Sequence, residues 1–151
     1  MRDQTRKRVL VVDDAGLVRR YYREILESGG YEVDEALNGV EAMERLLQQV
    51  CDLLIVDIFM PGMDGFETMR QVHQSRPDMP VIVISGQQFS LASEHAPDFL
   101  HMATRLGAVS SLQKPFKPSE LLAVVNGSLS SSQVWPGLHG KVPAGIPSER
   151  Q

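Results

Sequence analysis

Three short, unbroken apolar runs constrain the fold of this chain more than any other feature. They cover residues 9–12, 53–56 and 81–84, contain β-branched side chains, and are each followed by a polar or small residue. Continuous apolar runs of this length are typical of strands buried on both faces, as in parallel sheets. Residues 31–36 and 108–112 form two weaker candidates. The sequence therefore predicts five strands.

Amphipathic helical patterns lie between and after these strands. A helix is also expected at residues 98–106, closed by Gly107, and the last helix begins near Pro118, since proline suits the first helical turn. Alternating strands and helices, joined by right-handed crossovers, predict an α/β fold: a doubly wound five-stranded parallel sheet with helices on both faces. The stripes expected to face the core are Val18, Tyr22, Ile25 and Leu26; Val40, Met43, Leu46 and Leu47; Phe66, Met69, Val72 and His73; and Leu121, Leu122, Val125 and Leu129.

Composition narrows the function classes. Fifteen Lys and Arg against 19 Asp and Glu give a formal charge of −4, which does not favour nucleic-acid binding. The single cysteine, Cys51, cannot form an intramolecular disulfide and fits a reducing compartment. No apolar run approaches the roughly 18 residues of a membrane span, and the N-terminus lacks a signal peptide. We therefore expect a cytoplasmic protein that binds neither nucleic acid nor membrane.

The domain organisation follows from length and local composition. A chain of 151 residues predicts one domain with a short appendage. We expect a basic N-terminal leader at residues 1–7, a folded domain at 8–130, and a flexible tail at 131–151 that is rich in Gly, Pro and Ser.

Chemically active side chains stand where the predicted strands end. Asp13 and Asp14 follow the first strand, and Asp57 ends the third. Ser85 ends the fourth strand, and Lys114 follows the fifth. Because the carboxyl ends of parallel strands meet at one edge of a sheet, we expect these five side chains to converge.

This set of residue types suits phosphoryl transfer to a carboxylate. Three carboxylates repel one another, and a divalent cation with a preference for hard oxygen ligands, such as Mg²⁺, relieves that repulsion. A lysine and a hydroxyl supply donors for phosphoryl oxygens. Asp57 is the natural nucleophile because it ends a central strand, whereas Asp13 and Asp14 are better placed as metal ligands.

The same residues match a known pattern. The run Val-Leu-Val-Val-Asp-Asp covers residues 9–14, Asp57 precedes Met-Pro-Gly-Met-Asp-Gly at 60–65, and Ser85 and Lys-Pro-Phe at 114–116 follow. Over residues 8–130 the chain resembles the receiver domain of two-component response regulators. The resemblance implies a flavodoxin-like sheet with strand order 2-1-3-4-5.

The resemblance also implies residue roles. Asp57 would accept a phosphoryl group from a histidine kinase or a phosphotransfer protein. Mg²⁺ would be held by Asp13 or Asp14, Asp57 and the backbone carbonyl of Phe59. Such a protein signals by contact with a downstream protein, and it is not a conventional enzyme because it catalyses only its own phosphorylation and dephosphorylation.

Two further contacts come with the resemblance. Ser85 and Lys114 would contact the phosphoryl oxygens, and the bond between Lys114 and Pro115 is commonly cis in the family.

The chain departs from the family pattern in two places. Ser111 stands where the family usually has an aromatic switch residue, so a readout by a moving ring is not expected. The connection at residues 86–97 exceeds the roughly 2–6 residues of an ordinary strand-to-helix loop.

Other interpretations stay open. Asp13 or Asp14 alone could cap the first helix. Within the receiver class, the protein could be a phosphate sink without a signalling output. A haloacid dehalogenase-type phosphatase also uses an aspartate at a strand end, but usually has a second aspartate where this chain has Phe59. A nucleotide- or flavin-binding module is disfavoured because no glycine-rich loop follows the first strand.

Overall fold

The computed structural model describes residues 6–57, 65–85, 105 and 108–130. Strands and helices alternate in the described residues up to 85, and the helix expected at 98–106 lies outside the described part except for Arg105. The elements are β1 (Arg8–Val12), α1 (Gly16–Ser28), β2 (Glu32–Ala36), α2 (Gly39–Gln48), β3 (Leu53–Asp57), α3 (Gly65–Ser75), β4 (Val81–Ser85), β5 (Ala108–Gln113) and α5 (Pro118–Ser130).

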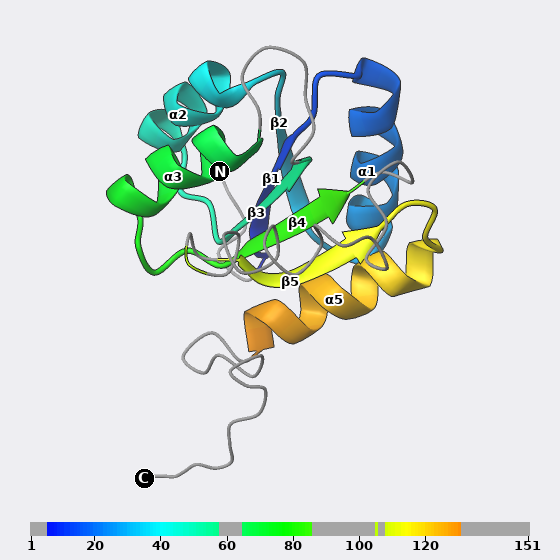
Figure 1. Cartoon of the computed structure of the whole chain (residues 1–151). Helices are drawn as coiled ribbons and strands as arrows, with labels where there is room; N and C mark the ends of the chain where they lie inside the picture. Colours follow the sequence, from blue (N-terminus) through cyan, green and yellow to red (C-terminus); the bar gives the residue numbers. More distant parts are fainter. Residues whose placement is uncertain (1–5, 58–64, 86–104, 106–107, 131–151) are drawn as a thin grey trace, which may run out of the picture.

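All five strands form one parallel sheet in the order β2-β1-β3-β4-β5. Helices α1 and α5 cover one face of the sheet, and α2 and α3 cover the other (Figure 1). The predicted doubly wound sheet and its strand order 2-1-3-4-5 are therefore confirmed.

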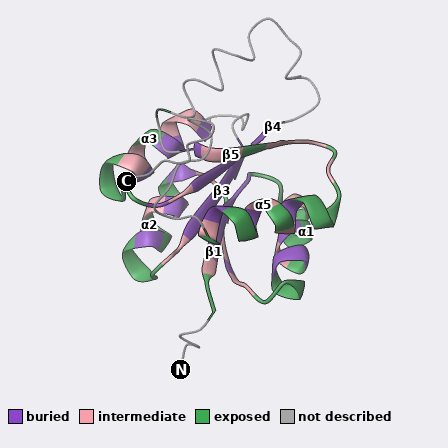
Figure 2. Ribbon diagram, turned by 90° about the horizontal axis from the view of Figure 1, so that it is seen from below, coloured by how far each residue is buried: buried purple, intermediate pink, exposed green. Residues whose placement is uncertain are grey.

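Alternation along the strands divides the core into two layers. In β3, Leu54 and Val56 pack with α2 and α3, whereas Leu53 and Ile55 pack with α1 and α5. Every residue of β3 is buried, as expected for a central strand covered on both faces. Figure 2 shows this buried layer between helices whose outer faces are exposed.

The predicted helical stripes are confirmed for α1, where Tyr22, Ile25 and Leu26 are buried, and each of α3 and α5 likewise buries two of its predicted residues. The stripe predicted for α2 is wrong in part. Val40 and Leu47 are 57% and 83% exposed.

The buried face of α2 is formed by Gly39, Ala42 and Leu46. The buried positions are shifted by about one residue along the sequence from the predicted ones. Small residues occupy the positions nearest the sheet, and large apolar residues lie beside them. A stripe chosen by large side chains is therefore displaced around the helix.

The helices of the described part are also informative about membranes. None of them combines the length and the apolar character needed to cross a bilayer.

Candidate functional site

Three of the predicted site residues meet at the carboxyl edge of the sheet. Val12 of β1 lies opposite Val56 of β3, so the residues that follow them, Asp13 and Asp57, are neighbours. The Nζ atom of Lys114, which follows β5, lies 3.4 Å from Asp57 Oδ2 and 3.9 Å from Asp13 Oδ2. Both aspartates are buried, with 2% of Asp13 and 9% of Asp57 exposed.

The other predicted site residues are placed less fully. Asp14 is exposed, whereas its neighbour Asp13 is buried. The backbone of Ser85 ends β4 at the same edge, beside Gln113 of β5, and its side chain is outside the described part. Phe59 also lies outside the described residues.

The two carboxylate oxygens of Asp13 have different surroundings. Oδ1 accepts a hydrogen bond of 2.9 Å from the backbone N–H of Ala15, at the entry to α1. Oδ2 is buried and has no hydrogen-bond partner among the residues that the structure describes. Ala15 is itself the N-cap of α1 and that helix has no side-chain cap hydrogen bond, so the alternative in which Asp13 caps the helix is wrong. The bond to the Ala15 N–H fixes the turn before the helix and leaves Oδ2 for a ligand.

The segment around Asp13 has a support that the sequence interpretation missed. The guanidinium of Arg19 donates a hydrogen bond of 2.7 Å to the backbone carbonyl of Asp13, while its Nε binds Glu35 of β2. The signal was an arginine in the first two turns of the helix that follows the acidic pair. Arg19 thereby ties α1 to the strand end that carries the site.

Electrostatics at the site favour an added cation. The pKa of Asp13 is raised from 3.8 to about 6, mainly by burial and in smaller part by the carboxylates of Asp57 and Asp14, against the lowering effects of the Ala15 N–H and of Lys114. One ammonium group therefore does not fully offset the cost of holding two carboxylates away from water.

The described donor set fits Mg²⁺. This ion commonly takes one or two protein carboxylates and keeps several of its waters. Asp13 and Asp57 supply two carboxylates, and Oδ2 of Asp13, which accepts no hydrogen bond from the described residues, is an available hard ligand. Within the described ranges no group of three or more His, Cys, Asp or Glu residues gathers closely enough to hold a metal.

The Lys114–Pro115 peptide bond is cis, as the resemblance implied. The next residue, Phe116, is partly buried and packs against the core layer formed with α1 and α5.

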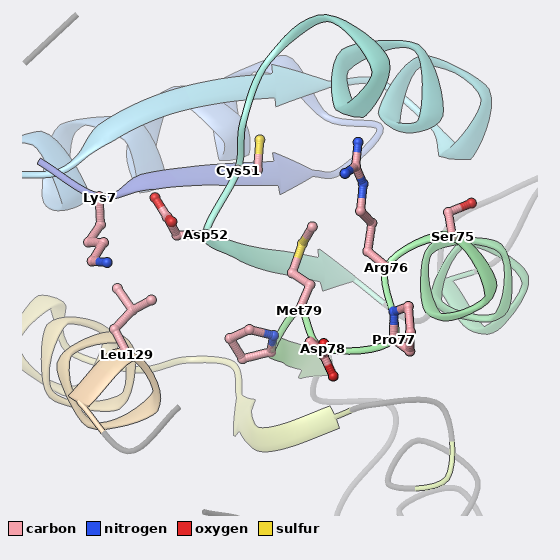
Figure 3. Close-up of a pocket in the computed structure, with 10 residues that line it drawn as sticks. Lys7, Cys51, Asp52, Ser75, Arg76, Pro77, Asp78, Met79 and Leu129 are labelled. Atoms are coloured by element: carbon pink, nitrogen blue, oxygen red, sulfur yellow. The ribbon is translucent and has the colours of Figure 1, made fainter. Parts of the chain in front are cut away.

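A pocket of about 500 Å³ lies at the opposite, amino end of the sheet (Figure 3). It is bordered by residues that precede β1, β3 and β4, among them Lys7, Asp52 and Pro80, and by Leu129 of α5. Its lining mixes cationic, anionic and apolar side chains, and it shares no residue with the acidic site.

The raised pKa of Asp13 predicts a particular pH dependence of stability. The folded protein holds the Asp13 proton up to a pH of about 6, whereas the unfolded chain releases it near 3.8. Ionisation of Asp13 therefore lowers the free energy of unfolding as the pH rises through this window. In EDTA, Asp13→Asn should match the wild type below pH 4 and become progressively more stable than it between about pH 4 and 6.

Urea unfolding of both proteins across this pH range measures the difference in their free energies of unfolding. Other carboxylates, such as Glu35 with its lowered pKa, are present in both proteins, so the difference reports on Asp13. Mg²⁺ at pH 8 should reduce the advantage of the variant. A difference that does not change with pH would show that burial of this carboxylate carries no electrostatic cost.

Comparison with known proteins agrees with this geometry. The sequence matches the response regulator receiver domain over residues 9–126. It is 36% identical to the chemotaxis protein CheY of Thermotoga maritima over 123 residues, which are 80% of this chain and 95% of that protein. It is 35% identical to the response regulator MprA of Mycobacterium ulcerans over 127 residues, and there the chain spans about half the relative, 52% of its length.

Solved structures give the same result. The CheY-like receiver domain protein of Methanospirillum hungatei JF-1 superposes with a TM-score of 0.74 at 30% identity, covering 85% of this chain and 97% of that one. CheY4 of Vibrio cholerae superposes with a TM-score of 0.72 at 30% identity, covering 81% and 98%. The parallel sheet, the buried acidic pair and these similarities together show that the chain belongs to the response regulator receiver domain family.

Proposed function

We propose that this receiver domain takes a phosphoryl group onto Asp57 with the help of Mg²⁺. The observation that carries the proposal is the position of the Lys114 ammonium, 3.4 Å from a carboxylate oxygen of Asp57 and beside the second buried aspartate, Asp13. Two carboxylates and an ammonium group from three separate strand ends meet there.

The chemistry follows from these positions. An oxygen of Asp57 attacks phosphorus in line with the phosphorus–nitrogen bond of a phosphohistidine. That bond breaks, its electron pair stays on the histidine nitrogen, which takes up a proton, and an acyl phosphate forms on Asp57. Attack by water on phosphorus later returns the carboxylate and releases inorganic phosphate.

The remaining residues of the site stabilise charge. Lys114 offers its ammonium to the phosphoryl oxygens, and Ser85, at the end of the neighbouring strand, offers a hydroxyl. Asp13 and Asp57 would hold the metal, with Asp14 and the Phe59 carbonyl as the further ligands that the family resemblance suggests. Bound Mg²⁺ neutralises charge that builds on the phosphoryl oxygens.

The phosphoryl donor we propose is a sensor histidine kinase or a phosphotransfer protein, and the output is contact with a downstream protein. Phosphorylation shifts the population between two arrangements of the region around β4 and β5, and a partner that prefers one of them binds it. Ser111 is exposed on β5 and has no ring to move, so this readout uses other residues.

Incubation with acetyl phosphate and Mg²⁺, followed by intact-mass measurement, tests the proposal. We expect one phosphoryl adduct per chain, which hydroxylamine removes and EDTA prevents. Continuous turnover of varied phosphate esters would instead support a phosphatase, and failure to form any adduct would contradict the proposal. A phosphate sink would form the adduct but bind no partner differently when phosphorylated.

A further inference from the structure

The side chain of Tyr22 is buried beside the acidic site in a way that packing alone does not explain. Only 2% of the residue is exposed, and its hydroxyl has no hydrogen-bond partner in the part of the chain that the structure describes. A buried hydroxyl without a partner costs free energy, because it has lost its bonds to water and gained none. The sequence pattern predicted Tyr22 only as a core residue of α1.

The position of Tyr22 directs its hydroxyl toward the carboxyl edge of the sheet. Helix α1 starts at that edge with Gly16, and side chains of an α-helix lean toward its N-terminus. Tyr22 belongs to the core layer that contains Val11 of β1 and Ile55 of β3. Asp13 and Asp57 come two residues after Val11 and Ile55, so alternation places them on the same face of the sheet as Tyr22.

The aromatic ring of Tyr22 is held on its other side by the lysine segment. It stacks on Phe116, with ring centroids 5.8 Å apart and an interplanar angle of 26°. Phe116 is two residues after Lys114. The ring therefore lies between α1 and the segment that supplies the Lys114 ammonium.

The surroundings keep the hydroxyl protonated and available as a donor. Burial raises the pKa of Tyr22, and the carboxylates of Asp13 and Asp57 raise it further. Asp13 Oδ2 is a buried acceptor that also lacks a hydrogen-bond partner among the described residues. An unused donor and an unused acceptor next to one site are the partners that an ordered water requires.

We propose that Tyr22 is a positioning residue for the metal site. When Mg²⁺ is bound, the Tyr22 hydroxyl donates a hydrogen bond to a water that Asp13 Oδ2 also binds. This inference rests on the proposed function, because it assumes that Asp13 takes part in Mg²⁺ binding. Partners of metal ligands that act in this way typically contribute about 10–100-fold to metal affinity.

The variant Tyr22→Phe tests the inference because it keeps the ring and its stacking on Phe116 and removes only the hydroxyl. In EDTA its Tm should equal or exceed that of the wild type, since an unpartnered buried hydroxyl is lost. Its affinity for Mg²⁺, measured by calorimetric titration of the unphosphorylated protein, should fall by about tenfold. The matched control is Tyr21→Phe on the same helix, where Tyr21 is 45% exposed and the affinity should not change.

The two measurements separate this inference from the proposed function. An unchanged Mg²⁺ affinity in Tyr22→Phe, with normal binding by the wild type, would overturn the role of Tyr22 alone. A lower Tm in EDTA would show that the hydroxyl already has a partner in the metal-free protein, which also overturns it. A wild-type protein that binds no Mg²⁺ would contradict both.

Discussion

Asp57→Asn should remain folded and form no phosphoryl adduct with acetyl phosphate and Mg²⁺. The amide has nearly the shape of the carboxylate, so the buried end of β3 keeps its packing, but the amide oxygen is a far weaker nucleophile and cannot form the acyl phosphate. The variant also removes one of two neighbouring buried negative charges. The pKa of Asp13 should therefore fall, and the metal-free protein should become more stable above pH 6.

Intact-mass spectra give the first result and urea unfolding in EDTA gives the second. The matched control is Asp78→Asn, since Asp78 is an exposed aspartate beside the pocket at the opposite end of the sheet. It should be labelled like the wild type. An adduct that persists in Asp57→Asn would place the phosphoryl acceptor elsewhere in the chain.

The sheet and the position of its active edge could be predicted because they depend on strong local signals. Continuous apolar runs identify buried strands, and the polar residue that ends each run marks its carboxyl end. Parallel pairing then brings those ends together whatever their separation in sequence. The distances from Lys114 to Asp57 and Asp13 agree with that expectation.

The choice between Asp13 and Asp14 could not be made in the same way. Alternation from Val9 and Val11 would select Asp13, but alternation holds only while the chain continues as a strand, and β1 ends at Val12. In the structure the two aspartates differ in burial, and the backbone gives the reason. The Asp13 N–H still donates to the Ala36 carbonyl at 3.2 Å, so Asp13 stays in line with the sheet while Asp14 is exposed.

The role of Tyr22 was hidden for a different reason. Its apolar ring and its helical spacing predict a core residue, and the residue is buried as predicted. The surroundings of its ring and hydroxyl include Phe116, which is distant in sequence, and Asp13, which lies outside the helix. A pattern within one helix contains no information on that point.

Removal of the Lys114 ammonium group should separate phosphoryl transfer from metal binding. In Lys114→Ala the rate of labelling by acetyl phosphate should fall by about 10²–10³-fold, the usual effect of deleting one donor to charge that develops in a transition state. Mg²⁺ should bind at least as tightly as to the wild type, because the ammonium no longer lies 3.4 Å from Asp57 Oδ2 and 3.9 Å from Asp13 Oδ2 in competition with it.

Labelling rates from timed intact-mass spectra and calorimetric Mg²⁺ titrations measure the two effects. Lys117→Ala is the matched control, since Lys117 is an exposed lysine three residues further on, and it should change neither quantity. Lys114→Arg keeps the charge but replaces a compact ammonium by a planar fork, so it should recover only part of the rate. If Mg²⁺ affinity and labelling rate fell together in Lys114→Ala, the lysine would be acting on the shape of the acidic pair rather than on the phosphoryl group.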